Sequence, residues 1–91
     1  GKIVQAFREL GCSVLDLSVM GQVCPGCHDL LVGSRLKGNI LVEVKDGSLP
    51  PSKKALNADQ VLFHDLWRGP QATVRSISEA VTLVCQDREK W

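Results

Sequence analysis

The sequence contains no tyrosine and only 4% aromatic residues, so aliphatic side chains must build most of any core. No run approaches the roughly 18 apolar residues of a membrane-spanning helix, and no charged segment followed by an apolar block begins the sequence. We therefore expect a soluble, intracellular protein without a membrane partner. Excess charge is also missing: the net charge is +1, so any contact with nucleic acid needs a local patch.

The composition that remains is that of one small folded domain. Hydrophobic residues make up 44% of the sequence and charged residues 23%, which is typical of a globular chain rather than a disordered one. A chain of 91 residues buries roughly 60–65% of its unfolded surface, so nearly all its elements must share one core. We expect a single domain over residues 1–91.

Hydrophobic periodicity predicts the elements of the first half. Apolar residues at helical spacing predict a helix over 2–10, and alternating apolar and polar residues predict a strand over 13–19. A short apolar run at 29–32 and a second strand at 39–45 predict an antiparallel hairpin that turns through 33–38.

Capping signals predict the elements of the second half. Residues 57–60 (Asn-Ala-Asp-Gln) resemble a capping box that opens a helix reaching about Trp67. A β-rich segment at 72–75 precedes a second capping-box pattern at 76–79, which opens the last helix. The predicted fold class is α/β, with the order α-β-β-β-α-β-α in a mixed sheet flanked by helices.

The segment Cys24-Pro25-Gly26-Cys27-His28 permits several chemical interpretations. It satisfies the C-x-x-C-H pattern of covalent haem attachment, but no export signal is present and the only methionine, Met20, lies just upstream, so we expect no haem. Cys24, Cys27 and His28 are soft ligands that suit Zn²⁺, so a non-catalytic metal- or DNA-binding module is an alternative. Against a zinc site, no second ligand pair completes the set. Scattered cysteines without an export signal indicate reduced thiols.

A different chemistry begins at Asp29. On the strand Ile40-Leu41-Val42-Glu43-Val44-Lys45, the charged Glu43 and Lys45 share one face, and the hairpin brings Asp29 alongside their end. Two carboxylates would then converge with an ammonium group. Mg²⁺ binds a few carboxylate oxygens, retains waters and takes substrate phosphate, while a lysine can orient a water. The alternative for Glu43 and Lys45 is a solvated ion pair at the edge of a sheet.

The spacing of Asp29 and Glu43-Val44-Lys45 is similar to the D…E-x-K signature of the restriction-endonuclease-like, or PD-(D/E)XK, nucleases. The blocks HDLLVG, ILVEVKDG and LNADQVLFHDLWRG, with a final strand and helix, resemble the small stand-alone VRR-NUC-type nucleases of phages and mobile elements. The resemblance covers nearly the whole chain. His28 departs from it, since most relatives have proline there, and relatives also carry polar residues ahead of the first helix.

This resemblance implies a site and an activity. Asp29, Glu43 and the main-chain carbonyl of Val44 would hold Mg²⁺ or Mn²⁺, Lys45 would position the attacking water, and Gln60 would line the same site. Relatives of this size act as homodimers on branched DNA such as four-way junctions, inside a bacterial host. The chain would accordingly be an endodeoxyribonuclease, either a junction resolvase or a less selective DNA-nicking enzyme.

Basic residues in the predicted turn and in the connector after the second strand are candidates for contacts with DNA phosphates. The alternative is ordinary surface solubility. The candidates are Arg35, Lys37, Lys53 and Lys54.

Overall fold

The computed structural model describes residues 1–45 and 57–85. Within these ranges it contains three α-helices, one 3-10 helix and four β-strands. In chain order they are α1 (Lys2–Glu9), β1 (Ser13–Asp16), η1 (Ser18–Gln22), β2 (Leu30–Ser34), β3 (Gly38–Val44), α3 (Ala58–Leu66), β4 (Gln71–Val74) and α4 (Ile77–Cys85). The predicted order α-β-β-β-α-β-α is confirmed.

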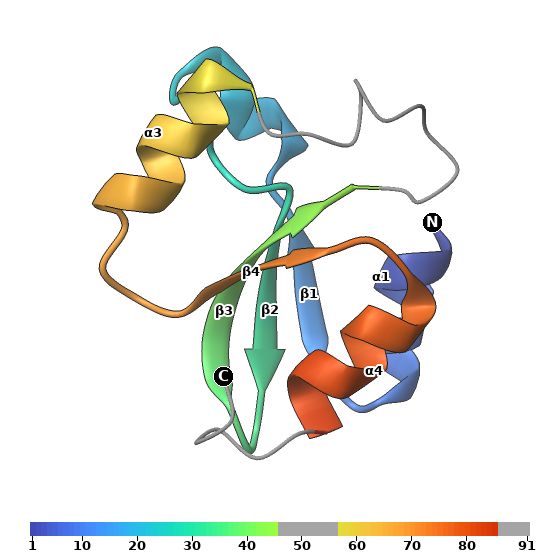
Figure 1. Cartoon of the computed structure of the whole chain (residues 1–91). Helices are drawn as coiled ribbons and strands as arrows, with labels where there is room; N and C mark the ends of the chain where they lie inside the picture. The colour runs from blue at the N-terminus through green and yellow to red at the C-terminus, as the bar shows by residue number, and fades with distance from the viewer. Residues whose placement is uncertain (46–56, 86–91) are drawn as a thin grey trace.

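The four strands form one mixed sheet in the order β1-β2-β3-β4 (Figure 1). The pairs β1–β2 and β2–β3 are antiparallel, whereas β3 and β4 are parallel and are joined through α3. β3 is therefore an inner strand with a neighbour on each side. Because the carboxyl end of β3 and the start of β2 lie at the same edge of the sheet, residues 29 and 43–45 are neighbours.

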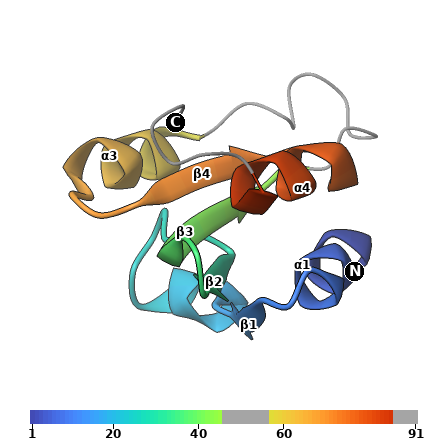
Figure 2. The ribbon, with the colours of Figure 1, turned by 90° about the horizontal axis from the view of Figure 1, so that it is seen from below.

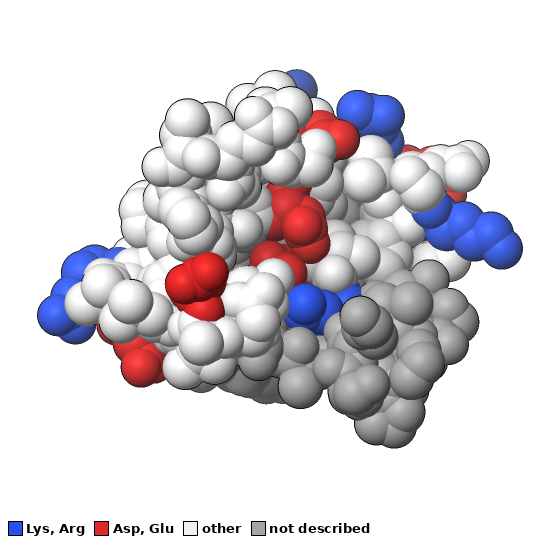
Figure 3. Space-filling view, turned by 90° about the horizontal axis from the view of Figure 1, so that it is seen from above, with Lys and Arg blue, Asp and Glu red and all other residues white. Residues whose placement is uncertain are grey.

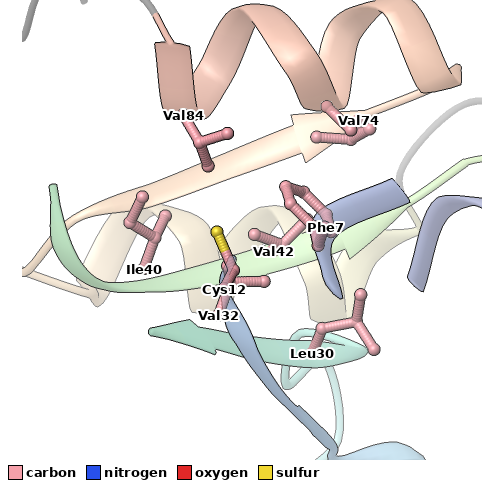
Figure 4. Packing of buried hydrophobic residues seen from close by; sticks show 9 residues of the cluster. Phe7, Cys12, Leu30, Val32, Ile40, Val42, Val74 and Val84 are labelled. Atoms are coloured by element: carbon pink, nitrogen blue, oxygen red, sulfur yellow. The ribbon is translucent and has the colours of Figure 1, made fainter. Parts of the chain in front are cut away.

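α1 and α4 lie together on one side of the sheet, and α3 lies on the other (Figure 2). The core forms between the sheet and helices α1 and α4, where alternate strand residues point towards Phe7 and Val84 (Figure 4). Aliphatic side chains dominate it, as the composition predicts. Its buried members are Phe7, Cys12, Leu30, Val32, Ile40, Val42, Val74, Ala80 and Val84.

Two boundaries differ from the periodicity-based expectation. The strand predicted over 13–19 ends at Asp16, because its Oδ1 accepts a hydrogen bond of 2.8 Å from the Ser18 amide and the chain continues as η1. The hairpin turn is also shorter than 33–38, since Gly33 and Ser34 pair with β3. No helix in the described ranges is long and apolar enough to cross a bilayer.

Candidate functional site

Asp29 is fixed at the open end of the β2–β3 hairpin. Its Oδ2 accepts a hydrogen bond of 2.8 Å from the Val44 amide, and its main-chain carbonyl accepts one of 2.7 Å from the Leu17 amide. The first bond spans the hairpin and places the carboxylate beside the segment Glu43-Val44-Lys45. The sequence-predicted pairing of Asp29 with the end of β3 is therefore present in the structure.

Glu43 is almost completely buried, with 1% of its side chain exposed. It leaves β3 on the face opposite the aliphatic core, where α3 covers it. Its Oε1 accepts a hydrogen bond from Gln60 Nε2 and lies 3.6 Å from Lys45 Nζ. Its Oε2 is buried and has no hydrogen-bond partner among the described residues. A buried, incompletely paired carboxylate is costly, so this position carries a feature that packing alone does not require.

The electrostatics of Glu43 follow from this environment. The pKa of its carboxyl is raised from the ordinary 4.5 to about 7, mainly by burial and then by the neighbouring Asp29 carboxylate, while Lys45 acts in the opposite direction. One nearby ammonium group thus does not offset the combined effect of burial and a second carboxylate. The site has a deficit of positive charge.

Gln60 belongs to the site and to the start of α3 at once. Its side-chain Oε1 accepts a hydrogen bond of 3.0 Å from the main-chain amide of Asn57. Its main-chain amide donates one of 2.9 Å to Asn57 Oδ1, which completes the predicted capping box. The remaining Nε2 group of the same side chain donates to Glu43. The capping geometry therefore fixes the orientation in which Gln60 meets the carboxylate.

The turn before Asp29 packs directly against this helix start. Gly26 has φ +87°, and a Cβ added there would overlap the main-chain carbonyl of Asp59. Glycine is thus required for both conformation and space. In the same turn, burial raises the pKa of the Cys27 thiol, and the nearby Cys24 raises it as well, by a smaller amount.

Gly26→Ala is expected to destabilise the fold by about 2 kcal/mol or more, because positive-φ strain adds to the overlap with Asp59. Gly11→Ala is the matched control: Gly11 has φ +86° but nothing within 4 Å of an added Cβ, so only the conformational cost of about 1 kcal/mol applies. Chemical denaturation of both variants measures the difference. Equal losses would contradict close packing of the turn on α3.

His28 forms part of a buried aromatic group beside the site. Its fully buried ring stacks on His64 with centroids 4.1 Å apart and meets Phe63 edge-on at 5.4 Å. Neither ring nitrogen has a hydrogen-bond partner of acceptable geometry in the described ranges. The pKa of His28 is lowered from 6.5 to about 4, mainly by burial and then by His64, while the Gln71 side chain acts in the opposite direction. His28 is thus a neutral packing group at neutral pH.

The residues present fit a hard divalent cation better than a soft one. Within the described ranges, no group of three or more His, Cys, Asp or Glu side chains is placed to hold a metal ion, so a zinc site of Cys24, Cys27 and His28 is not formed. Asp29 and Glu43 supply two carboxylates, one with an unpartnered buried oxygen. Mg²⁺ and Mn²⁺ need few protein ligands, because water and substrate complete their coordination.

A cavity of about 590 Å³ opens beside Asp29. Asp16 lines it from β1, and Lys2 and Arg75 contribute cationic side chains. Figure 3, a view from above relative to Figure 1, shows acidic side chains gathered near the middle of the visible face, with a basic side chain next to them. The contact of Gly26 with α3 is the feature that the sequence did not predict. The Pro-Gly pair gave a signal for the turn, but not for its contact with α3.

The two candidate phosphate contacts that the structure describes, Arg35 and Lys37, lie away from the site. Arg35 lies in the β2–β3 turn, and Lys37 ends that turn with 6% exposure, at the opposite end of the hairpin from Asp29. Five paired residues separate the two ends, which corresponds to roughly 15 Å. Lys53 and Lys54 lie outside the described residues. The site as built consists of Asp29, Glu43, Val44, Lys45 and Gln60.

No family model matches this sequence, and no curated protein or solved structure is significantly similar to it.

Proposed function

We propose that this chain is a divalent-metal-dependent endodeoxyribonuclease of the PD-(D/E)XK type. The observation that carries the proposal is the buried Glu43 carboxylate, which contacts Lys45 and Gln60, lies near Asp29, and retains an unpartnered oxygen. A solvated surface ion pair would expose Glu43 and leave its pKa near the ordinary value. The burial and the raised pKa are instead typical of a site built to receive a cation.

Each residue has a role in phosphodiester hydrolysis. Asp29, Glu43 and the Val44 carbonyl would hold Mg²⁺ or Mn²⁺, which supplies Lewis-acid polarisation of the phosphate and lowers the pKa of water. Lys45 Nζ, 3.6 Å from Glu43 Oε1, would orient the attacking water by donating to its oxygen. Gln60 holds Glu43 in place through Nε2, so the carboxylate needs little reorganisation when substrate arrives.

The substrate follows from the sequence resemblance, which favours branched DNA and a homodimeric enzyme. Exposed apolar residues on α3 and at its C-cap offer surface that a second copy could cover, namely Val61, Leu62, Leu66 and Trp67. A dimer would present two sites to one junction. We therefore propose a four-way junction as the preferred substrate.

The test is cleavage of a labelled four-way junction, a linear duplex and a single strand with Mg²⁺ or Mn²⁺, by the wild type and by Lys45→Ala. We expect symmetric junction cleavage that depends on metal, and a loss of about a hundredfold or more in the variant. Arg8→Ala, an exposed charge change on α1, is the control. Equal cutting of all three substrates would indicate a less selective nicking enzyme, and metal binding without cleavage would indicate a non-catalytic module.

Gln60→Glu separates the capping role of Gln60 from its contact with Glu43. The new carboxylate can still accept from the Asn57 amide, but it places a third acidic group against Glu43. We expect helix capping to persist, metal affinity at neutral pH to change, and cleavage to fall about tenfold or more. Asn57→Asp is the control, because aspartate is an equally good N-cap and does not contact Glu43. Cleavage rates and melting temperatures measure both effects, and wild-type cleavage by Gln60→Glu would remove Gln60 from the site.

A further inference from the structure

The segment Cys24-Pro25-Gly26-Cys27 forms a single β-turn. The Cys27 amide donates a hydrogen bond of 3.1 Å to the Cys24 carbonyl, and Gly26 at the third position has φ +87°. Proline at the second position and a positive-φ glycine at the third define a type II turn. The two cysteines therefore occupy its first and last positions, whose Cα atoms lie less than about 7 Å apart in a β-turn.

This upper bound is compatible with a disulfide, since bridged cysteines have Cα atoms about 4.4–6.8 Å apart. Both cysteines are free and half-buried, so a small-molecule reagent can reach them. The other two cysteines are placed differently: Cys12 is in the core and Cys85 is at the end of α4. The pair in the turn is thus preorganised for intramolecular closure in a way that a flexible chain is not.

The turn is anchored on both sides. Gly26 packs against the Asp59 carbonyl at the start of α3, and Asp29 follows Cys27 after one intervening residue. A covalent link between Cys24 and Cys27 would fix the turn in the conformation that it already has. The bridge would therefore stabilise the segment that presents Asp29 rather than distort it.

We propose that Cys24 and Cys27 are a reversible redox modification site that reacts with low-molecular-weight disulfides. The thiolate of one cysteine attacks a sulfur of the reagent RSSR, forming a mixed disulfide and releasing RS⁻. The second cysteine, as thiolate, attacks the protein sulfur of that mixed disulfide and releases the second RS⁻. The two protein thiols are oxidised by two electrons, RSSR is reduced, and the two protons pass to the released thiolates as two RSH.

The experiment equilibrates the protein with glutathione buffers of graded potential, once folded and once in urea, and quantifies the bridge by mass after acid quenching and alkylation. Cleavage after acidic residues yields the fragment 17–29, which contains Cys24 and Cys27 without Cys12 or Cys85. We expect the equilibrium constant for bridge formation to be on the order of tenfold larger in the folded protein. By linkage, the oxidised protein should melt at a temperature higher by roughly 5–10 °C.

Cys24→Ser is the control, because its fragment 17–29 should carry only a mixed disulfide at Cys27, and the variant should show no rise in melting temperature on oxidation. An equal or smaller equilibrium constant in the folded protein would overturn the proposal, as would a bridge that joins Cys24 to Cys12 or Cys85. The inference is independent of the proposed nuclease activity, since every readout is a mass or a melting temperature. A protein inactive on DNA can still confirm it.

Discussion

Glu43→Gln is expected to abolish DNA cleavage and to raise the melting temperature of the metal-free protein. The substitution removes a buried negative charge while retaining nearly the same volume and an oxygen that can accept from Gln60. Its amide can donate towards Asp29, which replaces repulsion between carboxylates by attraction. Loss of a metal-holding carboxylate should lower kcat/KM by about a thousandfold.

The gain in stability should be about 1–3 kcal/mol above pH 7, which corresponds to a rise of roughly 4–8 °C per kcal/mol for a domain of this size. Thermal melts in EDTA and junction cleavage in Mg²⁺ measure the two effects. Glu9→Gln is the matched control, because Glu9 is exposed on α1 and its substitution should alter neither quantity. A Glu43→Gln protein that cleaves at the wild-type rate would refute the proposed site, whereas loss of both activity and stability would assign Glu43 a structural role.

Metal affinity should depend steeply on pH in a window set by Glu43. Its carboxyl has a pKa of about 7 without metal, so protons and Mn²⁺ compete for it at neutral pH. Above pH 7 the carboxylate is free, and below pH 7 the apparent dissociation constant should rise about tenfold for each pH unit. Calorimetric titration with Mn²⁺ between pH 6 and 8 checks this, and Glu43→Gln should show weak binding without this dependence.

The same pKa difference has a consequence for the metal-free fold. The folded state binds the Glu43 proton more tightly than the unfolded chain does. The contribution of this group to the free energy of unfolding is therefore fully present below pH 4.5 and is lost as the pH rises to about 7. The loss corresponds to about 3 kcal/mol. His28, with a pKa of about 4 in the folded state, acts in the opposite direction, since the unfolded chain gains its proton as pH falls below 6.5. Comparing wild type with Glu43→Gln isolates the carboxyl contribution, and saturating Mn²⁺ at pH 8 should restore stability.

Local patterns in the sequence predict that Asp29 meets Glu43 and Lys45, whereas only the family resemblance implied that Gln60 lines the same site. Hairpin periodicity places Asp29 beside the end of β3, and the capping box at Asn57 and Gln60 fixes the start of α3. Both signals depend on a few adjacent residues, so they can be interpreted without knowledge of the tertiary structure.

Features that depend on contacts between distant segments could not be predicted in this way. The near-complete burial of Glu43 requires α3 to cover the sheet, and the fit of Gly26 against Asp59 joins segments more than 30 residues apart. The position of Arg35 and Lys37 is a different case, since the number of paired residues in the hairpin already places its turn away from Asp29. Counting strand pairs would have separated these basic residues from the site.

If the proposed site binds a cation, the two hydrogen-bonding ends of Gln60 couple its occupancy reciprocally to the order of the first turn of α3. A ligand that draws Glu43 away from Gln60 changes the free energy of local opening at the helix start. By thermodynamic linkage, the factor by which a bound cation changes the opening equilibrium of this turn equals the factor by which opening of the turn changes cation affinity. Amide hydrogen exchange at Gln60 and Val61 would therefore report the binding of an ion that neither residue needs to touch.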